Sequence, residues 1–255
     1  MSAIIEIQHV SKSFETEKKA RYEVLDDLNI TLHENEFVCL LGPSGCGKST
    51  LLRIVSGLES ATEGKVFYRG QEMIKPRYEV GVVFQHYSLM PWLSVEDNIM
   101  LGLKFRHIPE KERREITEEY LAMVGLEKFR KSRPYELSGG MQQRVAIART
   151  LANDPDVVLM DEPFGALDAY TRILLQKELL RIWQMHKKTI LFVTHSVDES
   201  IYLADRVILM SRDHGKIERD IKVEIPRPRD RSNPLYGKLT DSLLTDLERV
   251  NNITI

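Results

Sequence analysis

Apolar and polar positions alternate at the start of the chain and group into short apolar runs further on. Residues 4–10 alternate as a half-buried strand does, and the apolar positions between 25 and 32 predict a second strand pair. Strands are also predicted over 65–68 and 80–84, the latter ending at Gln85. The short continuous apolar runs, typical of buried core strands, are residues 37–41, 157–160, 189–193 and 207–210.

The pattern becomes helical between residues 86 and 153. Ser94 with Asp97 three residues later forms a capping pair that predicts a helix start. Pro109 suits the first turn of a second helix, and Gly125 suits its C-terminal end. This stretch is predicted to be a helical subdomain inserted into a core.

Two further helices are predicted in the second half of the chain. One runs from about Tyr170 to Met185, and the other follows a Pro- and Arg-rich stretch over 226–234 that cannot form regular structure. The first is expected to place four apolar side chains on one face: Leu174, Leu175, Leu179 and Ile182. The second is expected to be amphipathic, with Leu235, Leu239, Leu243, Leu244, Leu247 and Val250.

Strands that alternate with helices predict an α/β fold with a mainly parallel sheet and ligands at the carboxyl ends of its strands. One domain is expected over residues 1–225, with a core at 1–85 and 154–225 and the helical subdomain at 86–153. Residues 226–255 form a linker and an amphipathic helix, too short for an independent regulatory domain.

Composition and charge narrow the class of protein. The chain has 255 residues, 42% hydrophobic and 29% charged, as a globular protein with a sizeable core does. Its 36 Lys and Arg nearly balance 38 Asp and Glu, so nothing in the charge calls for nucleic acid. No apolar segment is long enough to span a bilayer and no signal region begins the chain, so a cytosolic protein is expected.

The strongest motif is Gly42–Thr50, which follows an apolar run and precedes a predicted helix. It fits the phosphate-binding pattern G-x-x-x-x-G-K-[ST], in which backbone N–H groups and the helix N-terminus surround phosphate. Lys48 adds a charge for the β- and γ-phosphates of ATP, and Ser49 offers a hydroxyl to Mg²⁺. The predicted nucleotide-binding residues here are Gly42, Pro43, Ser44, Gly45, Cys46, Gly47, Lys48, Ser49 and Thr50.

The two cysteines, Cys39 and Cys46, lie in or beside this loop. A disulfide would distort the loop, so both are expected to be small fillers in a reducing compartment. Cys46 is expected to react with a maleimide and to be shielded by ATP.

Four polar residues follow predicted strands. Asp161 is placed to hold Mg²⁺, directly or through water, and Glu162 to orient or deprotonate an attacking water. An acidic pair is usually solvated surface, and a strand-end histidine is usually ordinary. In a chain with a phosphate loop, however, a γ-phosphate contact is a better interpretation of His195 than an ordinary strand-end histidine. Gln85 could meet both metal and water and report the nucleotide state to the helical insert.

A second anion site is predicted at the helix start formed by Ser138, Gly139 and Gly140. Ser138 caps the helix, and the glycines leave N–H groups bare at its positive end. In isolation, such a sequence is as often a plain helix start. A head-to-tail homodimer would give each nucleotide the lysine loop of one subunit and this helix start of the other.

Together these motifs resemble, in order and over nearly the whole chain, the series of an ABC transporter ATPase subunit. The quoted set is Gly42–Thr50, Gln85, Leu137–Gln142, Val157–Glu162, Gly165–Asp168 and His195. The resemblance implies a P-loop NTPase (RecA-like) core with an N-terminal antiparallel β subdomain and an inserted α-helical subdomain. Phe14 stands where a tyrosine is common, and Met141 precedes Gln142 where many members have glutamine directly.

The resemblance also implies residue roles. Phe14 would stack on adenine, Ser138–Gln142 would complete the partner's site, Glu162 would be the catalytic carboxylate, and Asp168 would help to link the two sites. His195 and Gln85 join Glu162 as catalytic residues. Mg²⁺ would be held by Ser49, Gln85 and Asp161.

Residues 85–99 and 226–231 resemble the nitrate, sulfonate and taurine importer branch. By this resemblance, Gln85–Leu93 would dock a membrane permease on the cytoplasmic face of the membrane, with a solute-binding protein as an indirect partner. The alternative is that Trp92 belongs to the core of the helical subdomain. An exporter ATPase, or an ABC ATPase acting on DNA or the ribosome, are the alternative functions. The solute is not readable, because an ATPase subunit does not touch it.

Overall fold

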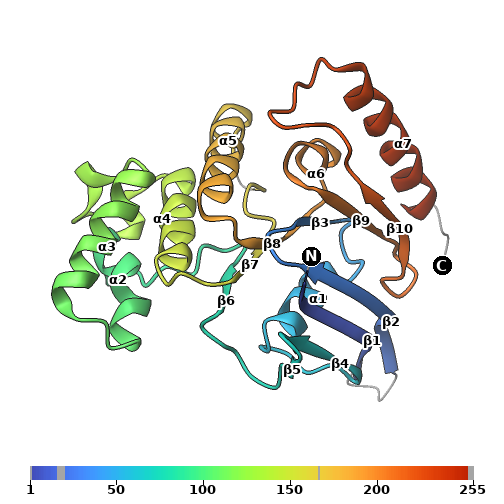
Figure 1. Cartoon of the computed structure of the whole chain (residues 1–255), viewed down its shortest axis with the longest axis horizontal. Helices are drawn as coiled ribbons and strands as arrows, with labels where there is room; N and C mark the ends of the chain where they lie inside the picture. Colours follow the sequence, from blue (N-terminus) through green and yellow to red (C-terminus); the bar gives the residue numbers. More distant parts are fainter. Residues whose placement is uncertain (1, 16–20, 166, 252–255) are drawn as a thin grey trace. The chain divides into compact units, whose positions relative to one another are not determined.

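The computed structural model of the chain describes residues 2–15, 21–165 and 167–251 (Figure 1). The chain divides into two compact units. Unit 1 comprises Met1–Arg77 and Leu180–Ile255, and unit 2 comprises Tyr78–Leu179. The predicted division into a core and a helical subdomain over 86–153 stays a prediction.

Unit 1 contains the predicted antiparallel sheet. Its strand order is β2-β1-β4-β5, and β1 is antiparallel to both β2 and β4. Alternate side chains of β1, such as Ile5 and Ile7, are buried, because successive residues of a strand face opposite sides of the sheet. The bounds are β1 (Ala3–Glu15), β2 (Arg21–His33), β4 (Glu63–Tyr68) and β5 (Gln71–Glu72).

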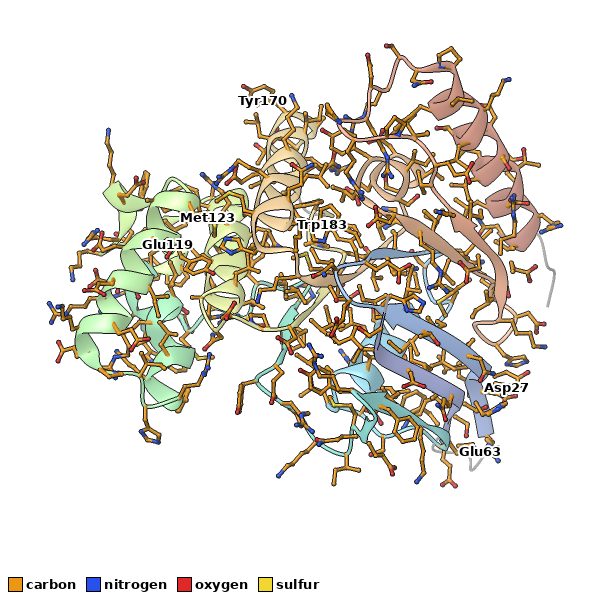
Figure 2. All side chains as sticks on the ribbon, in the orientation of Figure 1. Asp27, Glu63, Glu119, Met123, Tyr170 and Trp183 are labelled. Carbon is orange, nitrogen blue, oxygen red and sulfur yellow. The ribbon has the colours of Figure 1, made fainter. Side chains whose placement is uncertain are left out.

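A second sheet of unit 1 is built on β3 (Phe37–Leu41), whose five residues are all buried. It pairs in parallel with β8 (Thr189–Thr194) on one side and β9 (Arg206–Met210) on the other, as the continuous apolar runs predict. β10 (Ile217–Lys222) is antiparallel to β9. The core here includes Phe37, which meets Trp183, labelled in Figure 2, edge-on at 5.9 Å between ring centroids.

The helices of unit 1 include α1 (Lys48–Val55), α6 (Val197–Leu203) and α7 (Pro234–Asn251). The segment before α7 has no regular structure, as predicted, yet it is anchored by arginines. Arg229 is 6% exposed and donates hydrogen bonds of 2.6 Å to the carbonyl oxygens of Ile201 and Ala204, at the end of α6. Arg231 pairs with Asp198 in the first turn of α6 at 2.7 Å. The extended segment therefore holds both ends of α6.

Unit 2 combines two parallel strands with helices. β6 (Val80–Val83) and β7 (Val157–Asp161) pair in register, with Val83 opposite Met160. The helical elements are α2 (Val95–Phe105), α3 (Glu110–Met123), α4 (Gly139–Leu151), most of α5 (Ala169–His186), and the 3-10 turns Glu127–Phe129 and Pro134–Glu136.

The predicted helix ends of unit 2 are confirmed. Ser94 precedes α2, and its hydroxyl accepts the backbone N–H of Asp97 at 3.1 Å. Pro109 precedes α3, and Gly125 follows it with a φ of 64°, a conformation that favours glycine. Together with the parallel strands of both units and the antiparallel sheet of unit 1, these elements confirm the predicted fold class. No helix among the described residues is long and apolar enough to cross a membrane.

Two predicted apolar faces are partly wrong. In α5, Leu175, Leu179 and Ile182 are buried, but Leu174 is 47% exposed. One residue is a rotation of about 100° around a helix, which takes Leu174 off the buried stripe. In α7 the buried positions are Tyr236, Leu243 and Val250, whereas Leu235 and Leu244 are exposed for the same reason.

Candidate functional site

The glycine-rich loop runs from the end of β3 into α1, as predicted. Gly45 and Gly47 have φ of 83° and 96°, in the left-handed region that favours glycine. A Cβ atom on Gly42 would lie 2.7 Å from the carbonyl oxygen of Met210, and one on Gly47 would lie 2.5 Å from a methyl carbon of Leu25. These close approaches explain why glycine occupies both positions of the loop.

Lys48 carries a buried positive charge at the first residue of α1. Its side chain is 4% exposed, and Nζ donates hydrogen bonds of 2.8 Å to the carbonyl oxygens of Gly42 and Pro43. Among the described residues no carboxylate forms an ion pair with Lys48. A buried ammonium group with only neutral acceptors suits an anionic ligand, so the loop fits the phosphates of ATP.

Cys39 and Cys46 are free thiols, as expected, and both are buried. Burial raises the pKa of each thiol above its ordinary value, and the charge of Lys48 only partly offsets this. Cys46 is 1% exposed. The expected reaction of Cys46 with a maleimide is therefore contradicted, because reaction needs an accessible thiolate.

His195 lies at the same end of the parallel sheet as the loop. Thr194, the last residue of β8, pairs with Leu41, which immediately precedes Gly42. The exposed His195 lies at a bend directly after β8. The hydroxyl of Thr194 accepts the Ser196 N–H at 3.0 Å and donates to the Glu199 carboxylate at 2.5 Å.

The sequence missed the contact of Glu199 with Thr194, the residue that precedes His195. The backbone N–H of Glu199 donates to the Ser196 hydroxyl at 3.3 Å, and its 4%-exposed carboxylate accepts a hydrogen bond from the hydroxyl of Thr194.

Phe14 lies near the end of β1 in unit 1, and 42% of its surface is exposed. The ammonium group of Lys12 lies 4.8 Å from the centroid of its ring. The sequence also missed Lys12, although two residues of spacing on a strand place both side chains on one face.

In unit 2, Gln85 and Glu162 meet. β6 and β7 are parallel, so the residues that follow them emerge at one edge, and the Gln85 amide nitrogen lies 3.4 Å from a Glu162 carboxylate oxygen. Asp161, the last residue of β7, is 8% exposed. Glu162 has a φ of 42°, which is uncommon for a residue with a side chain and is frequent where function constrains the backbone.

The predicted helix start at Ser138 is confirmed. The hydroxyl of Ser138 accepts the N–H of Met141 at 3.3 Å, and Gly139 and Gly140 form the first turn of α4. The side chain of Gln142 donates to the carbonyl oxygen of Leu137 at 3.2 Å, so it folds back on the helix start. The N–H groups at this end of α4 can attract an anion.

Asp168 begins α5. Its carboxylate accepts the N–H of Thr171 at 3.0 Å, and this hydrogen bond lowers the pKa of Asp168. The side chain is exposed, so its negative charge can also meet a ligand or another chain.

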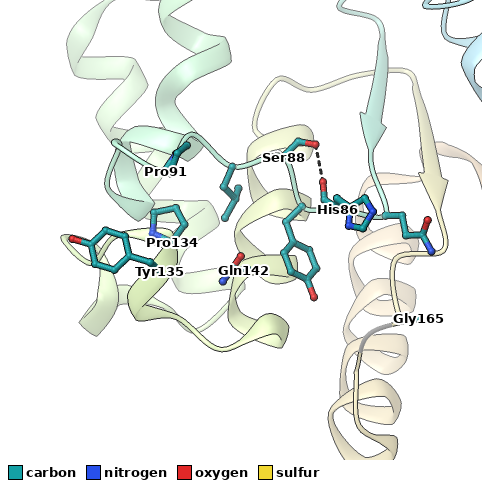
Figure 3. Close-up of a pocket in the computed structure, with 10 residues that line it drawn as sticks. His86, Ser88, Pro91, Pro134, Tyr135, Gln142 and Gly165 are labelled. Atoms are coloured by element: carbon teal, nitrogen blue, oxygen red, sulfur yellow. Dashed lines mark hydrogen bonds between the residues drawn. The ribbon is translucent and has the colours of Figure 1, made fainter.

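A pocket of about 630 Å³ lies within unit 2 (Figure 3). The segment after Gln85 forms one wall and residues around Tyr135 and Gln142 form another. Trp92, in the same segment, is 66% exposed. The alternative that Trp92 belongs to the core is therefore wrong.

The structure thus groups the predicted residues within each unit. Unit 1 holds Phe14, the loop Gly42–Thr50 and His195, and unit 2 holds the others: Gln85, Asp161, Glu162, Ser138, Gly139, Gly140, Gln142 and Asp168. Among the described residues, no group of three or more His, Cys, Asp or Glu side chains could hold a metal ion.

The chain is similar to known ATP-binding proteins of one family. The profile of the ABC transporter family matches residues 25–165. The chain is 54% identical to an uncharacterised ABC transporter ATP-binding protein of Methanocaldococcus jannaschii, over 97% of this chain and 92% of that one. It is 44% identical to the aliphatic sulfonates import ATP-binding protein SsuB of Bacillus cereus, over 96% of each chain. It is 46% identical to the bicarbonate transport ATP-binding protein CmpD of Synechococcus elongatus, over 93% of this chain and 88% of that one.

A solved structure is also similar. It is the dimeric post-hydrolysis state of an ATP-binding cassette bound to ADP and Pi, with a TM-score of 0.78 and 34% identity over 87% of this chain and 99% of that one. The chain therefore belongs to the ABC transporter family, as an ATP-binding subunit that hydrolyses ATP.

Proposed function

We propose that this chain is the ATPase subunit of a membrane importer for a small anion. Two copies close around two Mg-ATP, and hydrolysis lets them open, which moves the attached permease subunits. The similar cassette was solved as a dimer with ADP and Pi, which supports a dimeric working state. The subunit would act at the cytoplasmic face of the membrane, held there by the permease.

In this proposal the residues of unit 1 bind the nucleotide. Phe14 stacks on adenine, Gly42–Thr50 surround the phosphates, and Lys48 balances their charge. His195 contacts the γ-phosphate. Buried Lys48 with carbonyl partners and the register of Thr194 with Leu41 support these roles.

The residues of unit 2 supply the hydrolytic groups. Mg²⁺ is proposed to be held by Ser49, Asp161 and Gln85. When bound, it would neutralise phosphate charge. Glu162 takes a proton from the attacking water as the water oxygen bonds to the γ-phosphorus and ADP leaves. Ser138, Gly139, Gly140 and Gln142 are proposed to act on the nucleotide of the partner subunit, and Asp168 to link the two sites.

The observation that carries the proposal is the hydrogen bond from Gln85 to Glu162. It joins the proposed catalytic carboxylate to the first residue of the segment Gln85–Leu93. A change at the γ-phosphate that moves Glu162 must therefore alter the hydrogen bonding of that segment. This is the physical basis proposed for coupling between hydrolysis and the permease.

The segment Gln85–Leu93 is the proposed contact with the permease. Pro91 and Trp92 are exposed in it, and a large apolar side chain in water is typical of a contact surface. The pocket shown in Figure 3 lies beside this segment. An apolar helix of the permease is the partner that this surface suits.

The solute is proposed from the named relatives. One relative is named for aliphatic sulfonates and another for bicarbonate, and both solutes are small anions. Sulfonates and bicarbonate are therefore the first solutes to test, followed by nitrate and by taurine, a zwitterion that carries a sulfonate group. An exporter, or an ATPase acting on nucleic acid, is not supported by these relatives.

Affinity purification of the tagged chain from solubilised membranes tests the function. Co-purification of one permease and ATP-dependent uptake of one of these solutes into vesicles containing the complex are expected. Co-purification of ribosomes or DNA without a permease, or ATP-driven efflux of the solute, would contradict the proposal.

A further inference from the structure

Lys12 is a buried cation beside the proposed base-stacking residue. The residue is 9% exposed, and Nζ lies 4.8 Å from the centroid of the Phe14 ring. Nζ also donates to the Glu59 carboxylate at 2.6 Å and to the carbonyl oxygen of Ser60 at 2.7 Å. Three partners thus fix the ammonium group at one place against the ring.

The two hydrogen-bond acceptors of Lys12, in Glu59 and Ser60, belong to the segment that follows α1. The backbone N–H of Glu59 donates to the carbonyl oxygen of Arg53 in the last turn of α1, at 3.2 Å. α1 begins at Lys48, in the phosphate loop. A continuous set of contacts therefore connects the phosphate-binding helix, through Glu59 and Lys12, to the ring of Phe14.

We propose that Lys12 is a positioning residue for nucleobase binding, which fixes the ring of Phe14 and leaves one ring face to a purine. This inference rests on the proposed role of Phe14. A cation over an aromatic face is attracted by the negative charge of the π system. The ammonium group of Lys12 therefore fixes the orientation of the Phe14 ring. It also draws electron density away from the ring face on which a base would stack.

The geometry favours this role over a plain ion pair. An ion pair between Lys12 and Glu59 alone would not need an aromatic ring at the third side of the ammonium group. Phe14 is still 42% exposed although Lys12 covers part of it, so ring surface remains for a flat ligand. Aromatic stacking on a nucleobase needs only such a face.

The test compares a ligand with a base and a ligand without one. Binding of ADP and of inorganic pyrophosphate to the full chain is measured by calorimetry, since neither ligand is hydrolysed here. Lys12→Met removes the charge at similar volume and should weaken ADP binding about three- to tenfold while pyrophosphate binding stays within twofold. Lys12→Arg keeps a cation and should restore ADP binding to within about twofold.

A double variant separates this inference from the role of Phe14. Phe14→Ala should weaken ADP binding by itself, and adding Lys12→Met to it should weaken ADP binding no further. Equal loss of ADP and pyrophosphate binding in Lys12→Met, or a full further loss in the double variant, would overturn the positioning role. If Phe14→Ala leaves ADP binding unchanged, the stacking role of Phe14 itself is wrong.

Glu59→Gln is the second variant, in case Lys12→Met does not fold. It keeps the shape of the partner and removes its charge, so it loosens Lys12 without deleting it. A smaller loss of ADP binding in the same direction is expected, with pyrophosphate binding unchanged. Unchanged binding of both ligands would contradict the connection through Glu59.

Discussion

The amide nitrogen of Gln85 lies 3.4 Å from a carboxylate oxygen of Glu162, at the ends of two paired strands of unit 2. One of these residues begins the proposed permease contact, and the other is the proposed catalytic base. A substitution at either residue should therefore separate ATP binding, hydrolysis and transport from one another.

Replacing Glu162 by Gln should stop turnover while ATP binding remains. The amide cannot accept the proton of the attacking water, so the rate of ATP hydrolysis should fall by about 10²- to 10⁴-fold. With ATP and Mg²⁺ the variant should accumulate as a closed dimer, measured by size-exclusion chromatography with light scattering.

Glu119→Gln is the matched control, since Glu119 is exposed on α3 (Figure 2). It should hydrolyse ATP like the unaltered chain. Unchanged turnover in Glu162→Gln would remove Glu162 from its proposed role, and a variant that stays monomeric at saturating ATP would contradict the dimer.

Replacing Lys48 by Ala should abolish measurable nucleotide binding in calorimetry. The substitution deletes a buried charge proposed to bind the phosphates and leaves the carbonyl oxygens of Gly42 and Pro43 without its hydrogen bonds. Lys75→Ala, at an exposed position, should bind ATP normally. ATP affinity equal in the two variants would show that the loop does not hold the phosphates.

Both native thiols should resist a maleimide at neutral pH. Cys39 and Cys46 are buried and their pKa values are raised, so little thiolate is present, whereas Ile74→Cys, at a position 78% exposed, should react within minutes. Mass spectrometry should find no maleimide label on the folded chain. After denaturation it should find two labels per chain, one on each cysteine. Rapid labelling of Cys46 in the native chain would contradict its burial.

The same raised pKa values predict a pH dependence of stability. The folded chain keeps the thiol protons to higher pH than the unfolded chain, so their contribution is fully present below the ordinary thiol pKa and is lost as pH rises through the folded pKa. The free energy of unfolding should therefore decline above about pH 9. A variant with alanine at both cysteines should show a shallower decline in urea titrations.

Replacing Arg229 by Ala should destabilise the fold without touching the nucleotide residues. The guanidinium group donates to carbonyl oxygens at the end of α6, and burial lowers its pKa to about 10. Loss of charged hydrogen bonds and exposure of buried acceptors should lower the free energy of unfolding by about 2–4 kcal/mol.

Arg231→Ala provides the comparison for Arg229→Ala, because its pair with Asp198 is partly exposed. Its loss should cost only about 1 kcal/mol or less. Urea midpoints measure both variants, and equal effects would contradict the dominant role assigned to the buried arginine.

Replacing Trp92 by Ala should uncouple the subunit from its permease. Since the side chain is 66% exposed, the isolated subunit should keep its thermal midpoint and its own ATP hydrolysis. Co-purification with the permease and stimulation of hydrolysis by the complex should fall. Ile74→Ala, at another exposed apolar position, should leave the complex intact, and a normal complex with Trp92→Ala would contradict the proposed contact.

The sequence by itself determined the order of elements and the phosphate loop. The tight turns at Gly45 and Gly47 follow from the sequence, because glycine readily adopts the positive φ that both residues have. The strand-end positions of Gln85, Asp161 and His195 were predictable as well, because buried parallel strands read as continuous apolar runs.

Only the tertiary structure decided which polar groups meet. The contact of Gln85 with Glu162, the contact of Lys12 with Glu59 and the hydrogen bonds of Arg229 join residues that are distant in sequence or lie in irregular segments. Periodicity reports which side of an element is buried, but it carries no information on the partner it is buried against. The partner of each element depends on the packing of the whole unit. The same packing leaves Leu174 and Leu244 exposed and buries Cys46.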